Sequence, residues 1–318
     1  MQGLKKCLVL LLVVGLAISI VSSADAAKMT KGKLEQIATI PVEGLIEGPA
    51  YCTTDGNWYF VEIATGWVSR ITVAGAYERF YDIGSPGGLG PNGMVWDDQA
   101  KKLLIAHRDK GICSLDIRTK QLEILADNYQ GEDFLGPNDL VLDSAGNIYF
   151  TDPWGSSLSN PIGRVYRLDR VTGEVMMLFD NLAFPNGLAI SPDGMYIYVG
   201  EFGANRLLRA FLFPEGKGTI FLHVCTYFNF GGGPDGMAMD VNGNLYIAHW
   251  GMNEIIVVEG QQGQIIDRIM LPDDRSGPTR IAFGGPDNKL LFITETAKNE
   301  IWTVSAKEEG LAIPPPKK

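Results

Sequence analysis

The sequence predicts an all-β fold: a six-bladed β-propeller with four antiparallel strands in each blade. Three observations lead to this prediction. One short phrase recurs six times at a near-constant spacing, each copy is followed by a turn and a β-rich run, and nothing after the N-terminal segment has the pattern of a long amphipathic helix. Four short strands per repeat, six times over, are typical of a propeller.

The recurring phrase is a proline that is usually followed by Asn or Asp and then by Gly. Successive prolines are 42 to 49 residues apart, which is the length of one blade. The six copies are Gly48-Pro49-Ala50, Gly90-Pro91-Asn92-Gly93-Met94, Gly136-Pro137-Asn138-Asp139-Leu140, Phe184-Pro185-Asn186-Gly187-Leu188, Gly233-Pro234-Asp235-Gly236-Met237 and Gly277-Pro278-Thr279-Arg280-Ile281.

Hairpin turns and further strands complete each repeat. The turns are rich in Asp, Gly and Asn, which tolerate the positive φ that tight hairpins require. A second β-rich run follows each turn, as in residues 58–61, 148–151 and 245–248, and two more runs such as 164–168 and 174–178 complete the unit. Each repeat therefore predicts one four-stranded blade.

The two ends of the repeat array complement each other. The last repeat ends after its third strand, at residues 300–304, whereas residues 34–40 precede the first phrase as an unassigned strand. We expect this N-terminal strand to join the C-terminal blade and close the ring, because closure removes exposed sheet edges. The propeller domain is predicted over residues 33–306, and residues 307–318 are predicted to be a tail without fixed structure.

Residues 1–26 have the organisation of a secretory signal peptide. Lys5 and Lys6 precede an apolar run over residues 7–21, and Ala24-Asp25-Ala26 resembles a cleavage site. We expect an exported protein, periplasmic or secreted; a retained membrane anchor is the alternative. Three cysteines remain outside this segment, Cys52, Cys113 and Cys225, and an odd count does not indicate a disulfide framework.

The charge balance limits the classes of partner. The formal net charge is -10 at pH 7, whereas nucleic acids and anionic membranes are bound by clustered Lys and Arg. We therefore expect a small-molecule ligand, with no nucleic acid and, after removal of the signal, no membrane. The sequence does not specify an oligomeric state.

The residue after the phrase's proline defines a first candidate ring. The innermost strand of every blade lies near the propeller axis, so equivalent residues of different repeats converge there. This position holds Asn92, Asn138, Asn186, Asp235 and Thr279; the first repeat has Ala50, with Glu47 three residues earlier. Carboxylate and amide oxygens without Cys or His favour a hard cation such as Ca²⁺. Ordinary turn formation by Asn and Asp is the alternative explanation.

A second candidate ring follows from hairpin geometry, because the end of the second strand lies beside the start of the first. Every residue at that place is titratable: Glu62, His107, Asp152, Glu201, His249 and Glu295. They predict either a set of proton-transfer groups or a polar rim around the tunnel. His107 and His249 are the best candidates for general acid or base by intrinsic pKa.

These residues carry a resemblance. The chain resembles the SMP-30/gluconolactonase/luciferin-regenerating family of calcium-dependent six-bladed propellers, most clearly at Glu47-Gly48-Pro49, Pro137-Asn138-Asp139, Pro185-Asn186-Gly187-Leu188 and Pro234-Asp235-Gly236-Met237. The resemblance implies one divalent metal, Ca²⁺ first and Zn²⁺, Mn²⁺ or Mg²⁺ as alternatives. It also implies that Glu47, Asn186 and Asp235 ligate the metal and that Asn138 is a fourth ligand or a substrate contact. Asp235 would then be general base or nucleophile.

The sequence departs from the family pattern in two places. An arginine that grips sugar-acid lactones in one branch is replaced by Gly136, and a histidine of the phosphotriesterase relatives is absent near Thr279. Aromatic residues also lead into the same face: Phe134, Trp154, Phe184, Phe202, Tyr227, Phe228, Phe230 and Trp250. A mouth lined by them would suit a partly apolar lactone or ester, whereas packing between blades is the alternative role.

The sequence therefore predicts a metal-dependent hydrolase of lactones or esters. Its predicted catalytic residues are Asp235, His107 and His249, and its predicted substrate-binding residues are Asn92, Asn138, Asp152, Glu201, Trp154 and Phe184. Two alternatives remain: a non-catalytic propeller that binds a ligand or protein, and a strictosidine-synthase-like lyase. The lyase would depend on Glu201 or Glu295 and on no metal.

Overall fold

The computed structural model describes residues 28–72, 74–88, 90–213, 218–272 and 277–314. The segment with the organisation of a signal peptide, residues 1–26, lies outside these ranges. In the described ranges, no helix is long and apolar enough to span a bilayer, and the three cysteines are free.

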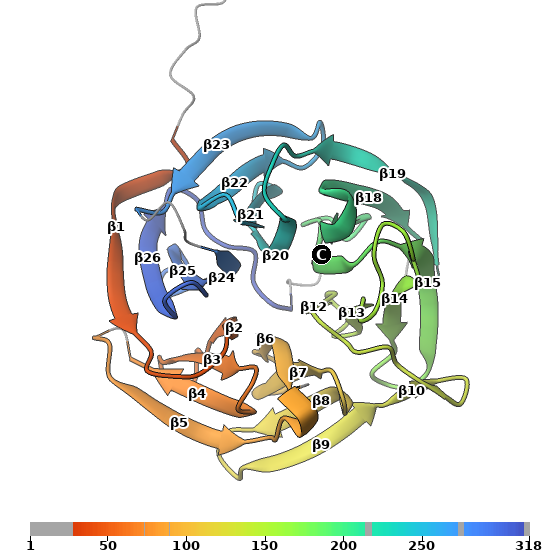
Figure 1. Ribbon diagram of the computed structural model, residues 1–318, viewed down its shortest axis with the longest axis horizontal. Coiled ribbons are helices and arrows are strands. Elements are labelled where there is room, and N and C mark those ends of the chain that lie inside the picture. Colours follow the sequence, from red (N-terminus) through yellow and green to blue (C-terminus); the bar gives the residue numbers. More distant parts are fainter. Residues whose placement is uncertain (1–27, 73, 89, 214–217, 273–276, 315–318) are drawn as a thin grey trace, which may run out of the picture.

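The described residues form a six-bladed propeller, as the sequence predicts (Figure 1). Each of the first five blades is one four-stranded antiparallel sheet that runs from the axis outward. Blade 1 holds β2 (Ile46–Tyr51), β3 (Trp58–Glu62), β4 (Trp67–Ile71) and β5 (Tyr77–Asp82); blade 2 holds β6 (Pro91–Asp97), β7 (Lys102–His107), β8 (Gly111–Asp116) and β9 (Gln121–Ala126); blade 3 holds β12 (Leu140–Leu142), β13 (Ile148–Asp152), β14 (Gly163–Leu168) and β15 (Val175–Leu182).

The remaining blades follow the same order. Blade 4 holds β16 (Pro185–Ile190), β17 (Tyr196–Glu201), β18 (Arg206–Leu212) and β19 (Thr219–Tyr227); blade 5 holds β20 (Gly233–Met239), β21 (Asn244–Trp250), β22 (Glu254–Glu259) and β23 (Gln264–Met270); blade 6 holds β24 (Pro278–Gly284), β25 (Leu290–Glu295), β26 (Glu300–Ala306) and β1 (Thr30–Thr39). A small hairpin, β10 (Asn128–Tyr129) with β11 (Glu132–Asp133), and two 3-10 turns, η1 (Pro86–Gly88) and η2 (Phe202–Ala204), lie between these strands.

The ring is closed by the N-terminal strand, which confirms the prediction from the sequence. Strand β1 pairs antiparallel with β26, with Thr30 opposite Ala306 and Thr39 opposite Glu300. Blade 6 is therefore built from both ends of the chain. This pairing covers the edge that β26 would otherwise expose.

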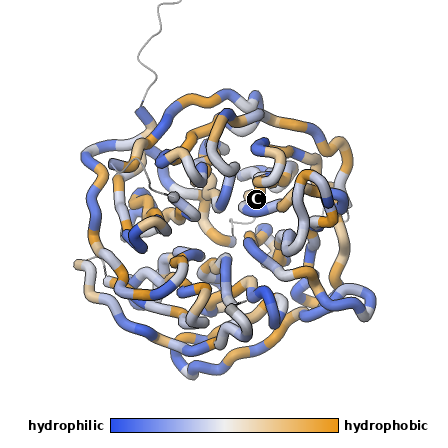
Figure 2. Tube along the Cα trace, in the orientation of Figure 1, coloured by the Kyte–Doolittle hydropathy of each residue, from blue (hydrophilic) through white to orange (hydrophobic). Residues whose placement is uncertain are grey.

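The hydrophobic core lies between the blades, in one cluster for each neighbouring pair. The second strand of a blade serves both of its neighbours because successive strand residues face opposite sides. In β3, Tyr59 and Val61 pack toward blade 2, whereas Trp58 and Phe60 pack toward blade 6. Trp58 stacks on Phe292 with ring centroids 4.4 Å apart, which ties the first blade to the last. Figure 2 shows hydrophobic and hydrophilic residues interspersed along the chain in every part of the ring.

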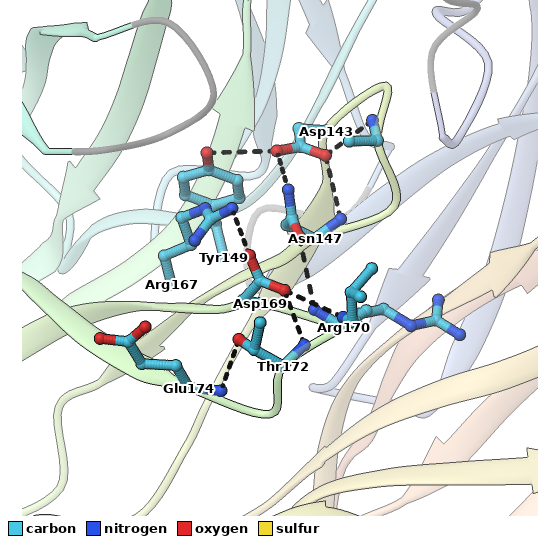
Figure 3. A network of polar contacts seen from close by, with 10 residues as sticks. Asp143, Asn147, Tyr149, Arg167, Asp169, Arg170, Thr172 and Glu174 are labelled. Atoms are coloured by element: carbon cyan, nitrogen blue, oxygen red, sulfur yellow. Dashed lines mark hydrogen bonds and ion pairs between the residues drawn. The ribbon is translucent and has the colours of Figure 1, made fainter.

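The hairpin turns predicted from Asp, Gly and Asn are held by carboxylate networks. In blade 3, Asp143 accepts hydrogen bonds from the backbone N–H and the side-chain amide of Asn147, at 2.9 and 2.8 Å, and from the Tyr149 hydroxyl (Figure 3). Blade 5 repeats the arrangement with Asp240 and Asn244. These bonds satisfy the turn's backbone donors and fix the register of the first two strands.

The C-terminal segment differs from its prediction. Residues 307–314 are not a tail without structure but a strap that extends toward the axis (Figure 1). Gly310 N–H donates to Asn288 O at 2.8 Å, and Leu311 N–H donates to Met239 O at 2.8 Å. Leu311 to Pro314 line an apolar cavity of about 480 Å³, together with residues of the inner strands. The expectation failed because the backbone bonds of the strap leave no periodic pattern in its sequence.

Candidate active site

Strand register shows which residues of the six blades are equivalent. Pro185 pairs with Glu201, Pro234 with His249 and Pro278 with Glu295. In blade 1 the residue equivalent to these prolines is Ile46, which pairs with Glu62. The residues that follow form one ring, with a member from each blade: Glu47, Asn92, Asn138, Asn186, Asp235 and Thr279. Aligning the repeats on proline places Ala50 in this ring, and the register corrects that position to Glu47.

Glycine after the ring residue lets neighbouring blades approach each other. A Cβ atom on Gly187 would lie 2.4 Å from the backbone oxygen of Asp235, and one on Gly48 would lie 2.4 Å from that of Asn92. Gly93 N–H donates to Asn138 O at 2.6 Å, which links two ring positions directly. The Pro-Asx-Gly phrase therefore recurs because the inner strands meet backbone to backbone at the axis.

Two ring carboxylates come from blades that are not neighbours and lie within electrostatic range of each other. Burial raises the pKa of Asp235 well above its ordinary value, and the negative charge of Glu47 raises it further, although the Asn186 amide and the Gly236 N–H oppose the shift. Burial also raises the pKa of Glu47, opposed by Arg280, the Gly48 N–H, Arg108 and Thr279. The side chain of Asp235 is half-buried. Two carboxylates so placed favour a shared cation.

The donor set suits a hard cation. Within the described ranges, no three side chains of His, Cys, Asp or Glu gather around one point. Glu47 and Asp235 are instead accompanied on the ring by the amides of Asn138 and Asn186, which are 6% and 5% exposed. Two carboxylates with amide oxygens fit Ca²⁺ and do not resemble a zinc site. All four metal ligands predicted from the sequence are thus members of one ring.

A buried ion pair lies next to this ring. At the position where four blades have glycine, blade 3 has Asp139 and blade 6 has Arg280, and these two side chains pair with each other. They come from opposite blades of the ring, and their side chains are 2% and 6% exposed. Burial lowers the pKa of Arg280 to about 10. The aliphatic part of Arg280 fits against Gly236, where a Cβ atom would clash with it at 2.3 Å.

A second arginine faces the ring from blade 2. Arg108 follows β7, and its guanidinium carbon lies 4.5 Å from the centroid of the Trp154 ring. Burial lowers the pKa of Arg108, while the charges of Glu47 and Asp235 raise it. Sequence reasoning missed both arginines. Arg108 lies outside the recurring phrase, and Arg280 lies within it at a position that was not considered as functional. For Arg280, the available signal was its charge opposite to that of Asp139, at the glycine position of the opposite blade.

The second candidate ring is structural. Asp152 accepts hydrogen bonds from the N–H groups of Leu135 and Gly136, Glu201 from that of Ala183, and Glu295 from that of Gly277. Each carboxylate thus holds the segment that enters the inner strand of its own blade. Glu62 differs, since it pairs with Arg79. Burial raises the pKa of Asp152, opposed by its two backbone donors. Asp152 and Glu201 are therefore held against the backbone of their own blades, just before the ring residues Asn138 and Asn186.

The two histidines have their ring nitrogens occupied or enclosed. His107 Nε2 donates to Gly84 O at 2.9 Å, while Nδ1 accepts from two backbone N–H groups of the following turn. His249 Nε2 donates to the side-chain oxygen of Asn205 at 2.9 Å. Its Nδ1 is buried, and burial lowers its pKa to about 4. Both rings are fully buried, so neither is placed as the acid or base that the sequence predicted.

The predicted aromatic mouth is present in part. Phe184, Phe202 and Trp250 form a row with centroids 5.8 and 6.1 Å apart, beside the starts of the inner strands of blades 4 and 5. Trp154 and Trp250 are 40% and 42% exposed. Phe134 and Phe228 instead pack in the cores between blades. The row and Trp154 leave an apolar surface near Asn186 and Asp235.

Comparison with known proteins places this geometry in context. The chain is 32% identical over 213 residues to "Lactonase drp35" of Staphylococcus haemolyticus, an alignment that covers 63% of this chain and 64% of that protein. The chain thus spans somewhat less than two thirds of the length of this curated relative. It is similar in structure to a gluconolactonase from Xanthomonas campestris, with TM-score 0.74, 22% identity and coverage of 88% and 92%.

Another solved structure shares the same fold. This is a calcium-binding protein, regucalcin, from Agrobacterium tumefaciens, with TM-score 0.72, 21% identity and coverage of 91% of this chain and 98% of that one. The model of the SMP-30/gluconolactonase/LRE-like region matches residues 45–297, which include every member of the ring. The chain therefore belongs to the SMP-30/gluconolactonase/LRE-like family.

Proposed function

We propose that the protein is a hydrolase of lactones or related esters. The observation that carries the proposal is a pair of interacting carboxylates at the axis among amide side chains, the buried Glu47 and the half-buried Asp235. A propeller that served only as an interaction module would have no need of these charges in its tunnel. In the proposed reaction the oxygen of water bonds to the acyl carbon, the bond from this carbon to the ring oxygen breaks, and the ring oxygen leaves as a hydroxyl group.

Glu47, Asn138, Asn186 and Asp235 would hold one divalent cation, with Ca²⁺ preferred and Zn²⁺, Mn²⁺ or Mg²⁺ as alternatives. When bound, such a cation supplies a Lewis acid that polarises the carbonyl group of the substrate. The regucalcin relative is described as calcium-binding, which supports this choice.

Asp235 is the residue that would act on water or on the acyl carbon, as general base or as nucleophile. The Asn186 amide and the Gly236 N–H hydrogen-bond to its carboxylate and fix its orientation. The Thr279 hydroxyl approaches Glu47 and donates to Ile46 O at 3.3 Å, which holds the neighbouring strand in place. Such fixed orientation is what general-base catalysis requires.

The mouth favours a partly apolar substrate. Phe184, Phe202 and Trp250 would contact the alkyl or aryl part of a small lactone while its ester group reaches the ring. The drp35 lactonase and gluconolactonase relatives support a lactone as the substrate class. A lyase that depends on Glu201 or Glu295 is disfavoured, because backbone N–H groups already bind both carboxylates.

The test is hydrolysis of aliphatic, aromatic and sugar lactones and aryl esters by chelated protein, with and without Ca²⁺, Mn²⁺ or Zn²⁺. We expect turnover only with metal, and a loss of at least a hundredfold in Asp235→Ala and Glu47→Gln. Glu174→Gln, which changes a carboxylate on an exposed turn, is the control and should be unaffected. Ca²⁺ should also raise the melting temperature of the wild type. If folded, metal-loaded protein hydrolyses none of these substrates, the proposal is wrong.

A further inference from the structure

Within the described part of the chain, no acid or hydrogen-bond acceptor pairs with the side chain of Arg108, which lies beside the candidate active site. Among the described residues, its Nε atom is buried and has no hydrogen-bond partner. The guanidinium is instead fixed by stacking over Trp154, with 4.5 Å from its carbon to the ring centroid. Buried donors in native proteins are nearly always satisfied, so this arginine is placed for an acceptor that the described residues do not supply.

Most of the other described arginines pair with an acid or a carbonyl group. Arg280 pairs with Asp139, Arg79 with Glu62 and Arg206 with Glu201. Arg108 interacts with the charges of Glu47 and Asp235, yet no described carboxylate lies within ion-pair distance of it. Its charge therefore lies near the ring, and no described ring residue forms an ion pair with it.

The charges of the site support an anionic ligand. Glu47 and Asp235 together balance one divalent cation, and Asp139 balances Arg280. One positive charge remains, and it is that of Arg108. Opening a lactone turns a neutral ester group into a carboxylate, so negative charge develops on the acyl oxygens during the proposed reaction. A fixed guanidinium is a strong donor to such oxygens.

We propose that Arg108, oriented by Trp154, binds the acyl oxygens of the substrate as they gain negative charge, and binds the carboxylate of the product. This inference rests on the proposed lactone hydrolysis. It makes Arg108 a substrate-binding residue and Trp154 a positioning residue. Gly136 makes room for this pair: a Cβ atom on Gly136 would lie 2.8 Å from Cβ of Trp154.

Four variants test the inference by activity. Arg108→Ala should lower kcat/KM for a neutral lactone by about a hundredfold, mostly in kcat, because the interaction strengthens in the transition state. Arg108→Lys should keep part of the activity, and guanidine added to Arg108→Ala should restore part of it. Trp154→Ala should lower kcat/KM more than Trp154→Phe, since phenylalanine still offers a ring to stack on.

Arg209→Ala is the matched control. Arg209 also stacks on an aromatic side chain, with its guanidinium carbon 5.1 Å from the centroid of Tyr196, and its Nε atom is also buried without a partner among the described residues. Its Nη1 atom, however, donates to the backbone oxygens of Gly260 and Gln261. We expect wild-type activity from this variant. If Arg108→Ala retains activity within twofold of the wild type while the wild type is active, this inference is wrong and the hydrolase assignment still holds.

A binding measurement separates the inference from turnover. Titration calorimetry of the hydroxycarboxylate product into Ca²⁺-loaded protein should show equal affinity for the wild type and Arg209→Ala. The affinity of Arg108→Ala for the product should be at least tenfold weaker. Calorimetry with Ca²⁺ alone should show tighter binding to Arg108→Ala, on the order of tenfold, because a positive charge near the ring has been removed. Equal product affinity in wild type and Arg108→Ala would refute the role of Arg108, whatever the catalytic rates.

Discussion

The ion pair between Arg280 and Asp139 gives a prediction whose size follows from its burial. Both side chains are nearly inaccessible, so replacing one partner leaves the other charge buried without compensation. Such a loss lowers the free energy of unfolding by about 3 to 5 kcal/mol. The double variant Asp139→Gly/Arg280→Gly has no buried charge left and carries the glycine that four other blades have at this position. We expect it to be no less stable than either single variant.

Urea unfolding of chelated protein, followed by tryptophan fluorescence, measures these free energies for the wild type, both single variants and the double variant. The double-mutant cycle should give a coupling energy of about 2 kcal/mol or more. The exposed pair Arg70 and Glu78, whose side chains are 32% and 55% exposed, is the control cycle and should give less than about 1 kcal/mol. If the effects of Asp139→Gly and Arg280→Gly add to within about 0.5 kcal/mol, the pair does not stabilise the tunnel as we argue.

Two further predictions concern stability and strand approach. The pKa of His249 is lowered from 6.5 to about 4, so the unfolded chain binds more protons than the folded chain between these values. The contribution of His249 to the free energy of unfolding is therefore complete above pH 6.5 and falls by up to about 3 kcal/mol toward pH 4. Thermal unfolding at pH 7.5 and 5 should show a smaller loss of stability at the lower pH in His249→Gln than in wild type. A variant of the exposed His223, His223→Gln, should match wild type. Equal losses of stability in all three proteins would contradict the lowered pKa of His249. Gly187→Ala would force apart β16 and β20, because its Cβ meets backbone atoms of Asp235 and Gly236 at 2.4 and 2.8 Å. We expect a loss of about 1 to 3 kcal/mol by urea unfolding and weaker Ca²⁺ binding by calorimetry, and no change in either would show that the inner strands are not in contact there.

Much of the fold could be predicted from the sequence because each blade repeats the same local signals. Turns such as 143–147 carry the Asp and Asn that hold them, and the unpaired strand at 34–40 matched a blade that lacked its outer strand. The strap could not be predicted, because residues 307–314 bind other blades through backbone groups, which every sequence has. Periodicity reports burial of side chains and not the partners of main-chain atoms.

The candidate site could be predicted in part. Asn138, Asn186 and Asp235 follow a proline in the recurring phrase, so spacing alone placed them together. Glu47 stands three residues before Ala50, and the resemblance implies that it binds the metal. The register with β3 shows that it replaces Ala50 as the ring member of blade 1. The second ring was assigned correctly to one place in each blade, but residue type could not reveal that its carboxylates bind the backbone of their own blade.

The closure of the ring has a consequence for how the protein is made. Thr30 is among the first described residues to leave the ribosome, and its partner Ala306 is among the last. Blades 1 to 5 can form as they are synthesised, but blade 6 must wait for the whole chain, and the strap that binds Met239 and Asn288 comes later still. Until then, the inner strands lack their sixth neighbour and Trp58 lacks Phe292. Synthesis of blade 6 is therefore the step that lets Thr279 join Glu47 and complete the ring at the axis.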